Sequence, residues 1–192
     1  MNNLPHITVA IASVPPRTKM LRKAVWSALN QTMPAETLVI DVDHYRTGAA
    51  ATKNRALNRA TTEWTAILDD DDQFLPHHLE TLWLAAFNND ADVVYSIPQV
   101  VGGAGVDVHG RYGQPFDPDE LRRRSYIPTT SLFRTKLLQQ CGGFQCLPGS
   151  PYDDWGCYLA LLDAGAHFVH VPEVAWIWNH WGGNTSGQPD RW

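Results

Sequence analysis

Four consecutive aspartates, Asp69 to Asp72, follow a short apolar segment. Adjacent carboxylates repel one another, and a pair about 4 Å apart costs on the order of 1 to 4 kcal/mol, depending on the effective dielectric constant. A hard divalent cation would offset this repulsion, because Mg²⁺ and Mn²⁺ bind one or two carboxylates together with substrate phosphates. The alternative is a solvated acidic turn before a helix, whose dipole favours negative charge. The tetrad alone is consistent with both interpretations.

Two further groups of polar residues come late in the chain. Asp153 and Asp154 lie at the expected start of a helix, where the helix dipole alone is a sufficient reason for two acidic residues. His180 follows an expected strand and precedes two glycines, which permit a close approach of a ligand. A single histidine is more often structural, so neither group identifies a site without the other.

The remaining histidines and the tryptophans are open to ordinary structural interpretations. His167 and His170 alternate with apolar residues and are expected to be structural, whereas His77 and His78 are expected to be solvated. The rings of several tryptophans offer apolar faces for a sugar, and filling the core is at least as good an explanation for each of them. These tryptophans are Trp155, Trp176, Trp178 and Trp181.

The pattern of apolar residues predicts the elements that would position these groups. Short β-branched runs at 7–12, 38–42, 63–68 and 93–96 are typical of buried strands. Helical patterns lie between them, at 18–31, 49–60 and 76–86. This alternation predicts an α/β fold, with a mostly parallel central sheet and helices on both faces. Ligands of such sheets bind outside the carboxyl ends of the strands, which is where the aspartate tetrad lies.

The second half of the chain has a less regular pattern. Residues 102–116 are glycine-rich and predict a mobile loop, either a lid or acceptor-specificity element or an ordinary surface loop. Helices are expected at 119–124, 134–140 and 153–164. Strands are expected at 129–133, 167–171 and 174–178.

Composition limits the class of protein. The chain has 192 residues, of which 44% are hydrophobic and 18% charged, so a single domain over 1–192 with a real core is expected. A formal net charge of −5 argues against a general nucleic-acid-binding surface, although 122–124 is a run of three arginines. No apolar run approaches the roughly 20 residues that span a bilayer, and no secretory signal is recognised, so a cytoplasmic protein without a membrane partner is expected. Three cysteines without a CxxC pair favour reduced thiols.

Several motifs occur in a fixed order along the chain: T-K-N-R-A-L, I-L-D-D-D-D-x-x-L-P, R-x-x-L-L-x-x-C-G-G-F, D-D-W and N-H-W-G-G-N-T-S. In this order and spacing they resemble the family 2 nucleotide-sugar glycosyltransferases of the GT-A fold, over roughly residues 7–186. The resemblance favours the metal-binding interpretation of the tetrad. It also implies a donor-binding half, 1–98, and an acceptor-binding half, 99–192.

The resemblance implies roles for the donor-side acidic residues. Asp69 and Asp71 match the D-x-D motif of the family, with Asp70 as the spacer. Asp71 would bind the metal ion directly, and Asp69 would contact the ribose or a metal-bound water. His180 matches a late histidine that completes the metal site in many relatives.

On the acceptor side, Asp154 matches the second acidic residue of the family's E-D motif, which is the general base. Asp153 stands at the first position, where the family has glutamate. Asp153 and Trp155 are therefore assigned to the acceptor side.

Further residues match the nucleotide-binding positions of the family. Ala12-Ser13 and Arg17 occupy the place of its P-T-Y-N-R loop. Lys53 falls where the family often has a basic residue facing the nucleotide. The carboxylate that reads the nucleobase would be Asp43 or, as the less favoured alternative, Asp41.

The expected function is a metal-dependent, inverting transfer of a hexose-type sugar from a nucleoside-diphosphate sugar, with a UDP-sugar as first choice, to a hydroxyl group. Mn²⁺ or Mg²⁺ would stabilise the charge of the leaving diphosphate, and a carboxylate would take the proton of the hydroxyl. A small molecule, a protein and a modified nucleic-acid base are all open as acceptors.

Two alternatives remain. A nucleotidyltransferase that makes the activated sugar would need a Gly-rich basic loop after the first strand, and S-V-P-P is a poor version of it. A nucleotide-sugar-binding module without turnover would not require Asp71, Asp154 and His180 together.

Overall fold

The computed structural model describes residues 5–102, 113–150 and 152–180. They form a seven-stranded sheet with the order β2-β1-β3-β6-β5-β7-β4. The strands are β1 (Ile7–Ser13), β2 (Thr37–Val42), β3 (Trp64–Asp69), β4 (Gln73–Phe74), β5 (Val93–Val101), β6 (Ser131–Arg134) and β7 (Phe168–Asn179). The helices are α1 (Thr18–Leu29), α2 (Ala49–Leu57), α3 (His78–Asn89), α5 (Pro118–Arg123), α6 (Thr135–Gln140) and α7 (Asp153–Asp163).

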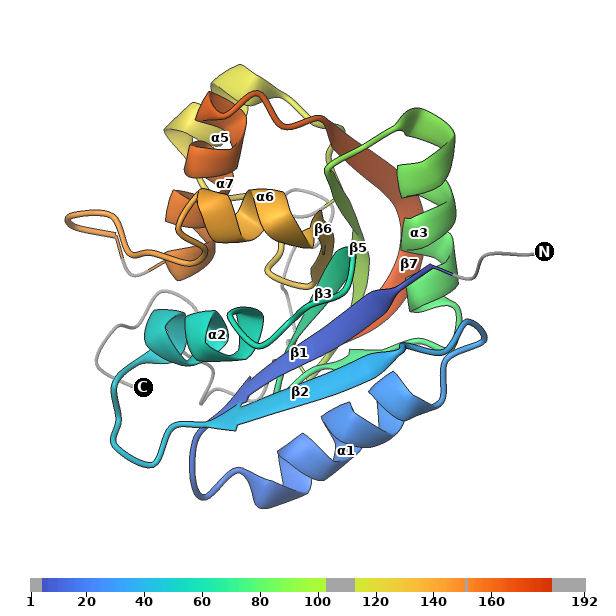
Figure 1. Cartoon of the computed structure of the whole chain (residues 1–192), viewed down its shortest axis with the longest axis vertical. Coiled ribbons are helices and arrows are strands. Elements are labelled where there is room, and N and C mark those ends of the chain that lie inside the picture. The colour runs from blue at the N-terminus through green and yellow to red at the C-terminus, as the bar shows by residue number, and fades with distance from the viewer. Residues whose placement is uncertain (1–4, 103–112, 151, 181–192) are drawn as a thin grey trace.

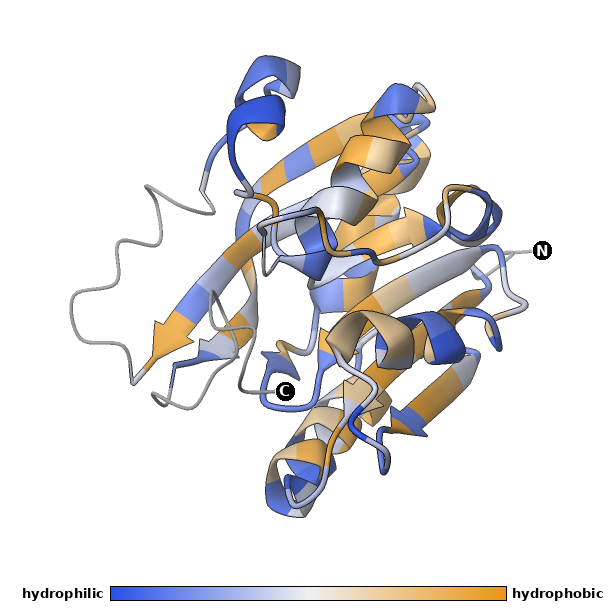
Figure 2. Cartoon of the chain, turned by 90° about the vertical axis from the view of Figure 1, so that its left-hand side faces the viewer, coloured by the Kyte–Doolittle hydropathy of each residue, from blue (hydrophilic) through white to orange (hydrophobic). Residues whose placement is uncertain are grey.

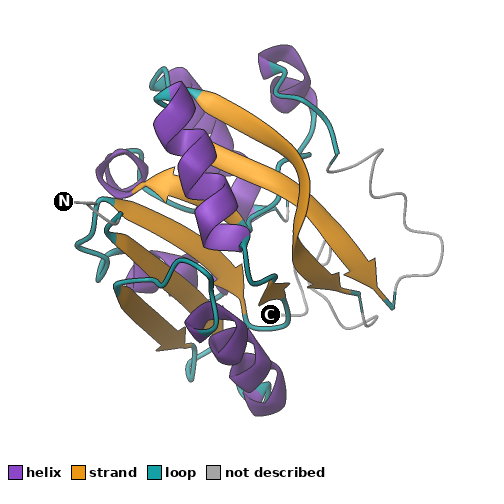
Figure 3. Cartoon of the chain, turned by 90° about the vertical axis from the view of Figure 1, so that its right-hand side faces the viewer, coloured by secondary structure: helices purple, strands orange, loops and turns teal. Residues whose placement is uncertain are grey.

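The sheet is covered by helices on both faces (Figures 1 and 3). β1 is buried along its whole length because its side chains alternate between two cores. Ile11 packs into the core that also contains Ala24 of α1 and Leu79 of α3. Ala10 packs into the other core, with Ala56 of α2 and residues of α5, α6 and α7. Figure 2 shows the matching hydropathy, with largely apolar strands and helices that alternate apolar and polar residues.

The longer ladders of the sheet are parallel: β1 with β2, β1 with β3, and β5 with β7. The shorter ladders, β3–β6, β5–β6 and β4–β7, are antiparallel. The predicted α/β class is therefore confirmed. Because β1, β2 and β3 run parallel, their carboxyl ends meet at one edge of the sheet, and Asp69 ends β3 there.

Two differences from the predicted elements concern the strands. The late strands expected at 167–171 and 174–178 form one strand, β7, whose pairing with β5 shifts register on either side of Ile97. The interruption in the apolar pattern is thus absorbed by a bulge and does not end the strand. β4 has only two residues, which is too short for a periodic signal.

The expectation that His78 is solvated is wrong. The side chain is fully buried, its ring stacks on Phe74 with centroids 4.0 Å apart, and Nδ1 is 3.1 Å from the carbonyl oxygen of Ala175. Burial lowers the pKa of His78 to about 3, so the ring is neutral. His77, the N-cap residue of α3, is only half-buried.

The tryptophans of β7 are part of the core. Trp176 and Trp178 are buried among apolar side chains, as the structural interpretation predicts, and Trp181 lies outside the described residues. Residues 103–112 of the glycine-rich loop also lie outside them. Phe116, near the end of this loop, stacks on Phe168 with ring centroids 4.5 Å apart. Among the described residues, no helix combines the length and the apolar composition needed to cross a membrane.

Candidate functional site

The first part of the site joins the end of β3 to the loop after β1. Asp70 is buried and accepts hydrogen bonds from Ser13 Oγ at 2.7 Å, from the amide of Val14 at 3.4 Å and from Arg17 Nη1 at 2.9 Å. Although burial raises the pKa of this carboxyl group, the hydrogen bond of Ser13 and the charge of Arg17 oppose the increase. Asp70, expected as the spacer of the motif, therefore holds the loop in place. Ala12, the residue before Ser13, is itself buried in β1.

The second part is an ion-pair network around Lys53. This side chain is only 5% exposed, and its Nζ lies 3.1 Å from Asp153 Oδ2 and 3.5 Å from Asp69 Oδ1. Burial alone would lower the pKa of Lys53, but the charges of Asp153, Asp69 and Asp154 outweigh it and raise the pKa. Lys53 is thus a permanent cation that links α2, β3 and α7. The nucleotide-facing role of Lys53 stays a prediction.

Asp69 is the least satisfied carboxylate of this network. Its Oδ1 is buried and has no hydrogen-bond partner among the described residues, only the ion pair with Lys53. Burial raises the pKa of Asp69, against the charge of Lys53, and the charge of Asp71 adds to the increase. A buried oxygen in this state is free to accept a donor from a ligand or to bind a cation.

Asp154 lies one residue after the start of α7. Its Oδ2 accepts a hydrogen bond from Thr129 Oγ1 at 3.0 Å, and Ser125 Oγ lies 3.5 Å from its Oδ1. Burial and the charge of Asp153 raise its pKa to about 6, although Lys53 and Thr129 oppose this. Such a carboxylate is ionised at neutral pH and accepts a proton more readily than an ordinary aspartate, which is what a general base requires.

The third part of the site brings the end of β7 to the tetrad. Asn179 donates from its amide to Asp72 Oδ1 at 3.0 Å and from Nδ2 to the carbonyl oxygen of Asp71 at 2.7 Å. His180 is the next residue. Its amide donates to Val101 at 2.8 Å, and its ring packs edge-on against Trp178. His180 therefore directly follows the residue that is hydrogen-bonded to the tetrad. The metal-binding role of its imidazole stays a prediction.

Asp71 and Arg17 complete the acidic end of this cluster. The carboxylate of Asp71 lies 3.6 Å from Arg17 Nη1, so one guanidinium contacts both Asp70 and Asp71. Asp72 is buried, and its pKa is raised well above the ordinary value by that burial and by the neighbouring aspartates. The cluster is therefore richer in carboxylates than in cations.

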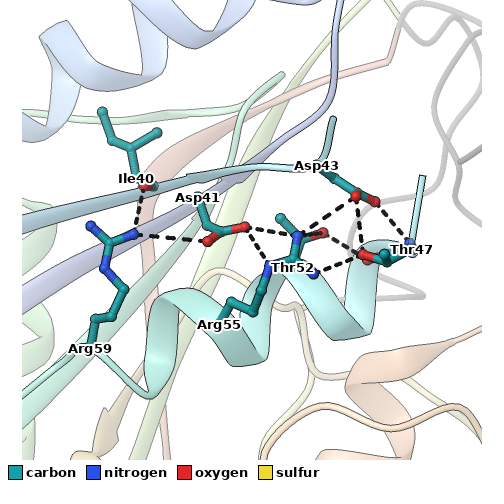
Figure 4. A network of polar contacts seen from close by, with 8 residues as sticks. Ile40, Asp41, Asp43, Thr47, Thr52, Arg55 and Arg59 are labelled. Carbon is teal, nitrogen blue, oxygen red and sulfur yellow. Dashed lines mark hydrogen bonds and ion pairs between the residues drawn. The ribbon is translucent and has the colours of Figure 1, made fainter. Parts of the chain in front are cut away.

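Figure 4 shows a separate polar network at the end of β2. Asp43 is buried and accepts hydrogen bonds from Thr47 Oγ1 at 3.0 Å and from the amide of Gly48 at 2.9 Å. Asp41 accepts a hydrogen bond from Arg55 Nε at 2.9 Å. Both candidate nucleobase readers thus organise the chain between β2 and α2, where Asp43 fixes the turn that begins α2.

Trp155, the residue after Asp154, borders a cavity. The cavity has a volume of about 540 Å³, and its lining includes Arg123, Arg124, Ser125, Ser150, Tyr152 and Trp155. The indole Nε1 of Trp155 donates to the carbonyl oxygen of Leu121 at 2.7 Å, which fixes the ring. Asp153, the other predicted acceptor-side residue, is instead buried against Lys53.

Three residues that were not predicted hold the site in place. Thr129 and Asn179 hold Asp154 and the tetrad, and Asn54 clamps both the amide and the carbonyl of Phe144 at 2.8 Å. Asn54 lies in the motif T-K-N-R-A-L and Asn179 in N-H-W-G-G-N-T-S, and these motifs were the sequence signal that could have identified them. Thr129 carries no spacing signal, because its partner lies 25 residues away.

The carboxylates of the site can be compared with the ligands that a divalent metal requires. The described part of the chain contains no group of three or more His, Cys, Asp or Glu side chains that could hold an ion alone. A cation shared with a diphosphate needs only one or two carboxylates from the protein. Asp69 and Asp71 offer them, and Asp69 Oδ1 is buried and accepts no hydrogen bond among the described residues. The residues present fit such an ion.

Comparison with known proteins identifies the relatives of this chain. The family model "Glycosyl transferase family 2" matches residues 39–146. The chain is 29% identical over 147 residues to the uncharacterized glycosyltransferase YwdF of Bacillus subtilis (strain 168), which covers 72% of this chain and 54% of YwdF.

Two solved structures are similar in fold. S. aureus TarS 1-349 in complex with UDP-GlcNAc has a TM-score of 0.72 at 18% identity, covering 92% of this chain and 59% of TarS. The mannosyltransferase PcManGT from Pyrobaculum calidifontis, in complex with GDP-Man and Mn²⁺, has a TM-score of 0.67 at 17% identity, covering 92% and 57%. This chain therefore spans little more than half the length of these relatives.

The structural similarity confirms the predicted GT-A fold. The family model covers more than half of the chain, including β3, the aspartate tetrad and Lys53. The chain belongs to glycosyl transferase family 2.

Proposed function

We propose that this chain transfers a sugar from a nucleoside-diphosphate sugar to a hydroxyl acceptor, with inversion at the anomeric carbon and Asp154 as the general base. The observation that carries the proposal is the link through Lys53, which joins Asp69 at the end of β3 to Asp153 at the start of α7. It keeps Asp154 within electrostatic reach of the tetrad.

The proposed chemistry is a single displacement. The acceptor oxygen attacks the anomeric carbon while its proton passes to the carboxylate of Asp154. The bond between that carbon and the diphosphate oxygen breaks, and its electron pair leaves with the nucleoside diphosphate. A carboxylate with a pKa of about 6 suits this step because it is ionised at neutral pH and still basic. One displacement from the face opposite the leaving group inverts the configuration.

The donor side would bind the nucleotide sugar through Ala12, Ser13, Arg17, Asp43, Lys53, Asp69 and Asp70. A UDP-sugar is the first candidate, since TarS, with the higher TM-score, is in complex with UDP-GlcNAc, while PcManGT is in complex with GDP-Man. The division into a donor half, 1–98, and an acceptor half, 99–192, and a cytoplasmic location are part of the same proposal.

Asp71 would bind Mn²⁺ or Mg²⁺ directly, with His180 as a second ligand, and Asp69 would contact the ribose or a metal-bound water. When bound, the ion would neutralise charge on the leaving diphosphate. The Mn²⁺ in the PcManGT complex supports this proposal. Arg17 lies against Asp70 and Asp71 and would itself contribute positive charge near the diphosphate.

The test measures turnover of UDP-glucose, UDP-GlcNAc, UDP-galactose and GDP-mannose by release of the nucleoside diphosphate. One donor is expected to be hydrolysed, with the activity lost in EDTA and restored by Mn²⁺ or Mg²⁺. Release that EDTA leaves unchanged would remove the metal from the proposal.

The matched variants are Asp154→Asn and Asp163→Asn, at the two ends of α7. Asp154→Asn is expected to lower transfer by about 10²- to 10⁴-fold, the usual contribution of a general base, and to leave UDP affinity in calorimetry unchanged. Asp163→Asn changes an exposed residue paired with Arg122 and is expected to match the parent. Equal transfer by Asp154→Asn and the parent would refute the base assignment.

A further inference from the structure

The cavity beside Asp154 has a charge that the proposed transfer to a neutral hydroxyl does not explain. Two arginines, Arg123 and Arg124, contribute to its lining, and no acidic side chain does so among the described residues. The chain as a whole is acidic, with a formal net charge of −5. The two arginines therefore give this cavity a local positive charge within an acidic chain.

We propose that this cavity binds an oxyanion, a phosphate or a carboxylate, which the sugar acceptor carries near the hydroxyl that is glycosylated. The inference rests on the proposed function and deepens it, because it names the chemical class of the acceptor. Guanidinium groups bind both kinds of oxyanion in a bidentate manner, so the two share one recognition chemistry.

Arg124 is held ready for such a ligand. Its Nε donates to Glu120 Oε1, and its Nη2 donates to Gln114 Oε1 at 2.9 Å. These two bonds use two of the five N–H groups of a guanidinium. The group also lies over the ring of Tyr126, 5.6 Å from its centroid. Its orientation is therefore set before a ligand arrives, which reduces the entropy lost on binding.

Arg123 is the more accessible cation. Its side chain is 73% exposed and has an ion pair with Glu120 Oε2 at 3.6 Å. Glu120 pairs with both arginines, so Arg123, Arg124 and Glu120 together have a formal net charge of +1. That charge selects for a single anionic group and leaves a bulky polyanion less favoured.

Arg122 provides an internal control. Its Nη2 donates to Asp163 Oδ1 at 2.8 Å, at the far end of α7, and it is not among the residues that line the cavity. The three consecutive arginines are thus separated by the structure into two that line the cavity and one that pairs elsewhere.

The cavity is connected to the proposed base by Ser125. This residue belongs to the cavity lining, and its Oγ lies 3.5 Å from Asp154 Oδ1. Trp155, whose ring is fixed by Leu121, adds an apolar face of the kind on which a sugar ring packs. An acceptor with its hydroxyl at Asp154 would therefore place a neighbouring oxyanion at the arginines.

The experiment is a binding assay without donor and without metal. Saturation-transfer NMR and calorimetry are carried out with glucose 6-phosphate, glucuronate, methyl glucoside and inorganic phosphate. The proteins are the parent, Arg123→Gln/Arg124→Gln and Arg122→Gln. Melting curves verify that each variant is folded.

We expect glucose 6-phosphate or glucuronate to bind the parent more tightly than methyl glucoside, and the stronger of the two identifies the oxyanion. The double variant is expected to lose at least tenfold in affinity, and Arg122→Gln is expected to match the parent. Equal binding to the parent and the double variant would overturn the inference, as would no preference over methyl glucoside. Binding of inorganic phosphate that all three proteins share would indicate a site elsewhere and also count against it.

Calorimetry with UDP separates this site from the donor site. The double variant is expected to bind UDP like the parent, and a tenfold loss would mean that the arginines hold the donor, which overturns the inference. Because the binding assay contains no donor sugar, its result does not depend on whether the protein transfers a sugar. Conversely, turnover of a nucleotide sugar without arginine-dependent anion binding refutes this inference alone.

Discussion

The ammonium group of Lys53 lies 3.1 Å from the carboxylate of Asp153, although the two residues are 100 positions apart. The same group lies 3.5 Å from Asp69, so one buried cation joins α2 to the end of β3 and the start of α7. This contact fixes the distance between the aspartate tetrad and the proposed base. The spacing of the site therefore depends on an ion pair that itself need not touch a substrate.

Replacing Lys53 by methionine is expected to destabilise the protein by about 3–5 kcal/mol, because it leaves a buried carboxylate without a counter-charge. Urea denaturation at pH 7 measures the loss. The double variant Lys53→Met/Asp153→Asn is expected to recover part of it, since the uncompensated charge is removed as well. Lys19→Met, at an exposed position of α1, serves as the control. A Lys53→Met protein as stable as the parent would show that the pair contributes nothing.

The activity is expected to depend on pH through Asp154. The proposed base must be ionised, so kcat/KM should rise as pH increases through about 6 and then reach a plateau. The rise is expected to be absent from the residual activity of Asp154→Asn. A parent profile that is flat from pH 5 to 8 would contradict the assignment.

Ionisation of Asp154, which the proposed activity requires, is expected to lower the stability of the protein. The pKa of Asp154 is about 6 in the folded protein and about 3.9 in an unfolded chain, so ionisation opposes folding above pH 6. Asp154→Asn is therefore expected to raise the free energy of unfolding by about 1–2 kcal/mol above pH 6, and the gain should vanish near pH 4. Urea denaturation at pH 4 and at pH 7.5 measures it. An equal effect at both values would mean that the carboxyl group does not titrate as proposed.

Asp71 is expected to act through the metal. Calorimetry of UDP in Mn²⁺ should give an affinity at least tenfold lower for Asp71→Ala than for the parent, whereas in EDTA the two proteins should be alike. Asp163→Ala, which removes an exposed carboxylate, is expected to follow the parent in both buffers. If Asp71→Ala retains the Mn²⁺-dependent affinity, Asp71 is not a metal ligand.

The fold and the candidate residues could be predicted because their signals are local. Apolar runs predict strands, and the order of short motifs predicts the family. The partners could not be predicted, because they come from distant parts of the chain: Ser13 holds Asp70 from 57 residues away, and Thr129 holds Asp154 from 25. The burial of His78 was missed for the same reason, since its environment is built by β4 and β7.

Gly156 is a position where helix propensity and packing predict opposite effects. It lies in α7, where alanine normally stabilises a helix by about 0.5–1 kcal/mol relative to glycine. A Cβ atom at this position would lie well inside van der Waals contact with the carbonyl oxygen of Gln145. The amide of the same Gln145 donates to the carbonyl oxygen of Asp153 at 3.1 Å, so relief of the clash must move the start of α7.

Gly156→Ala is therefore expected to destabilise the protein by about 1–3 kcal/mol, the usual cost of overpacking, and also to lower kcat because Asp154 is displaced. Gly165→Ala is the control for stability alone. A Cβ there meets no atom within 4 Å, but its φ of +82° strains an alanine, so a loss of about 1 kcal/mol with unchanged kcat is expected. Urea denaturation and steady-state kinetics distinguish the two variants. If Gly156→Ala proves more stable than the parent, the stabilisation from helix propensity is larger than the cost of the clash. Close packing of α7 on Gln145 would then not position the base.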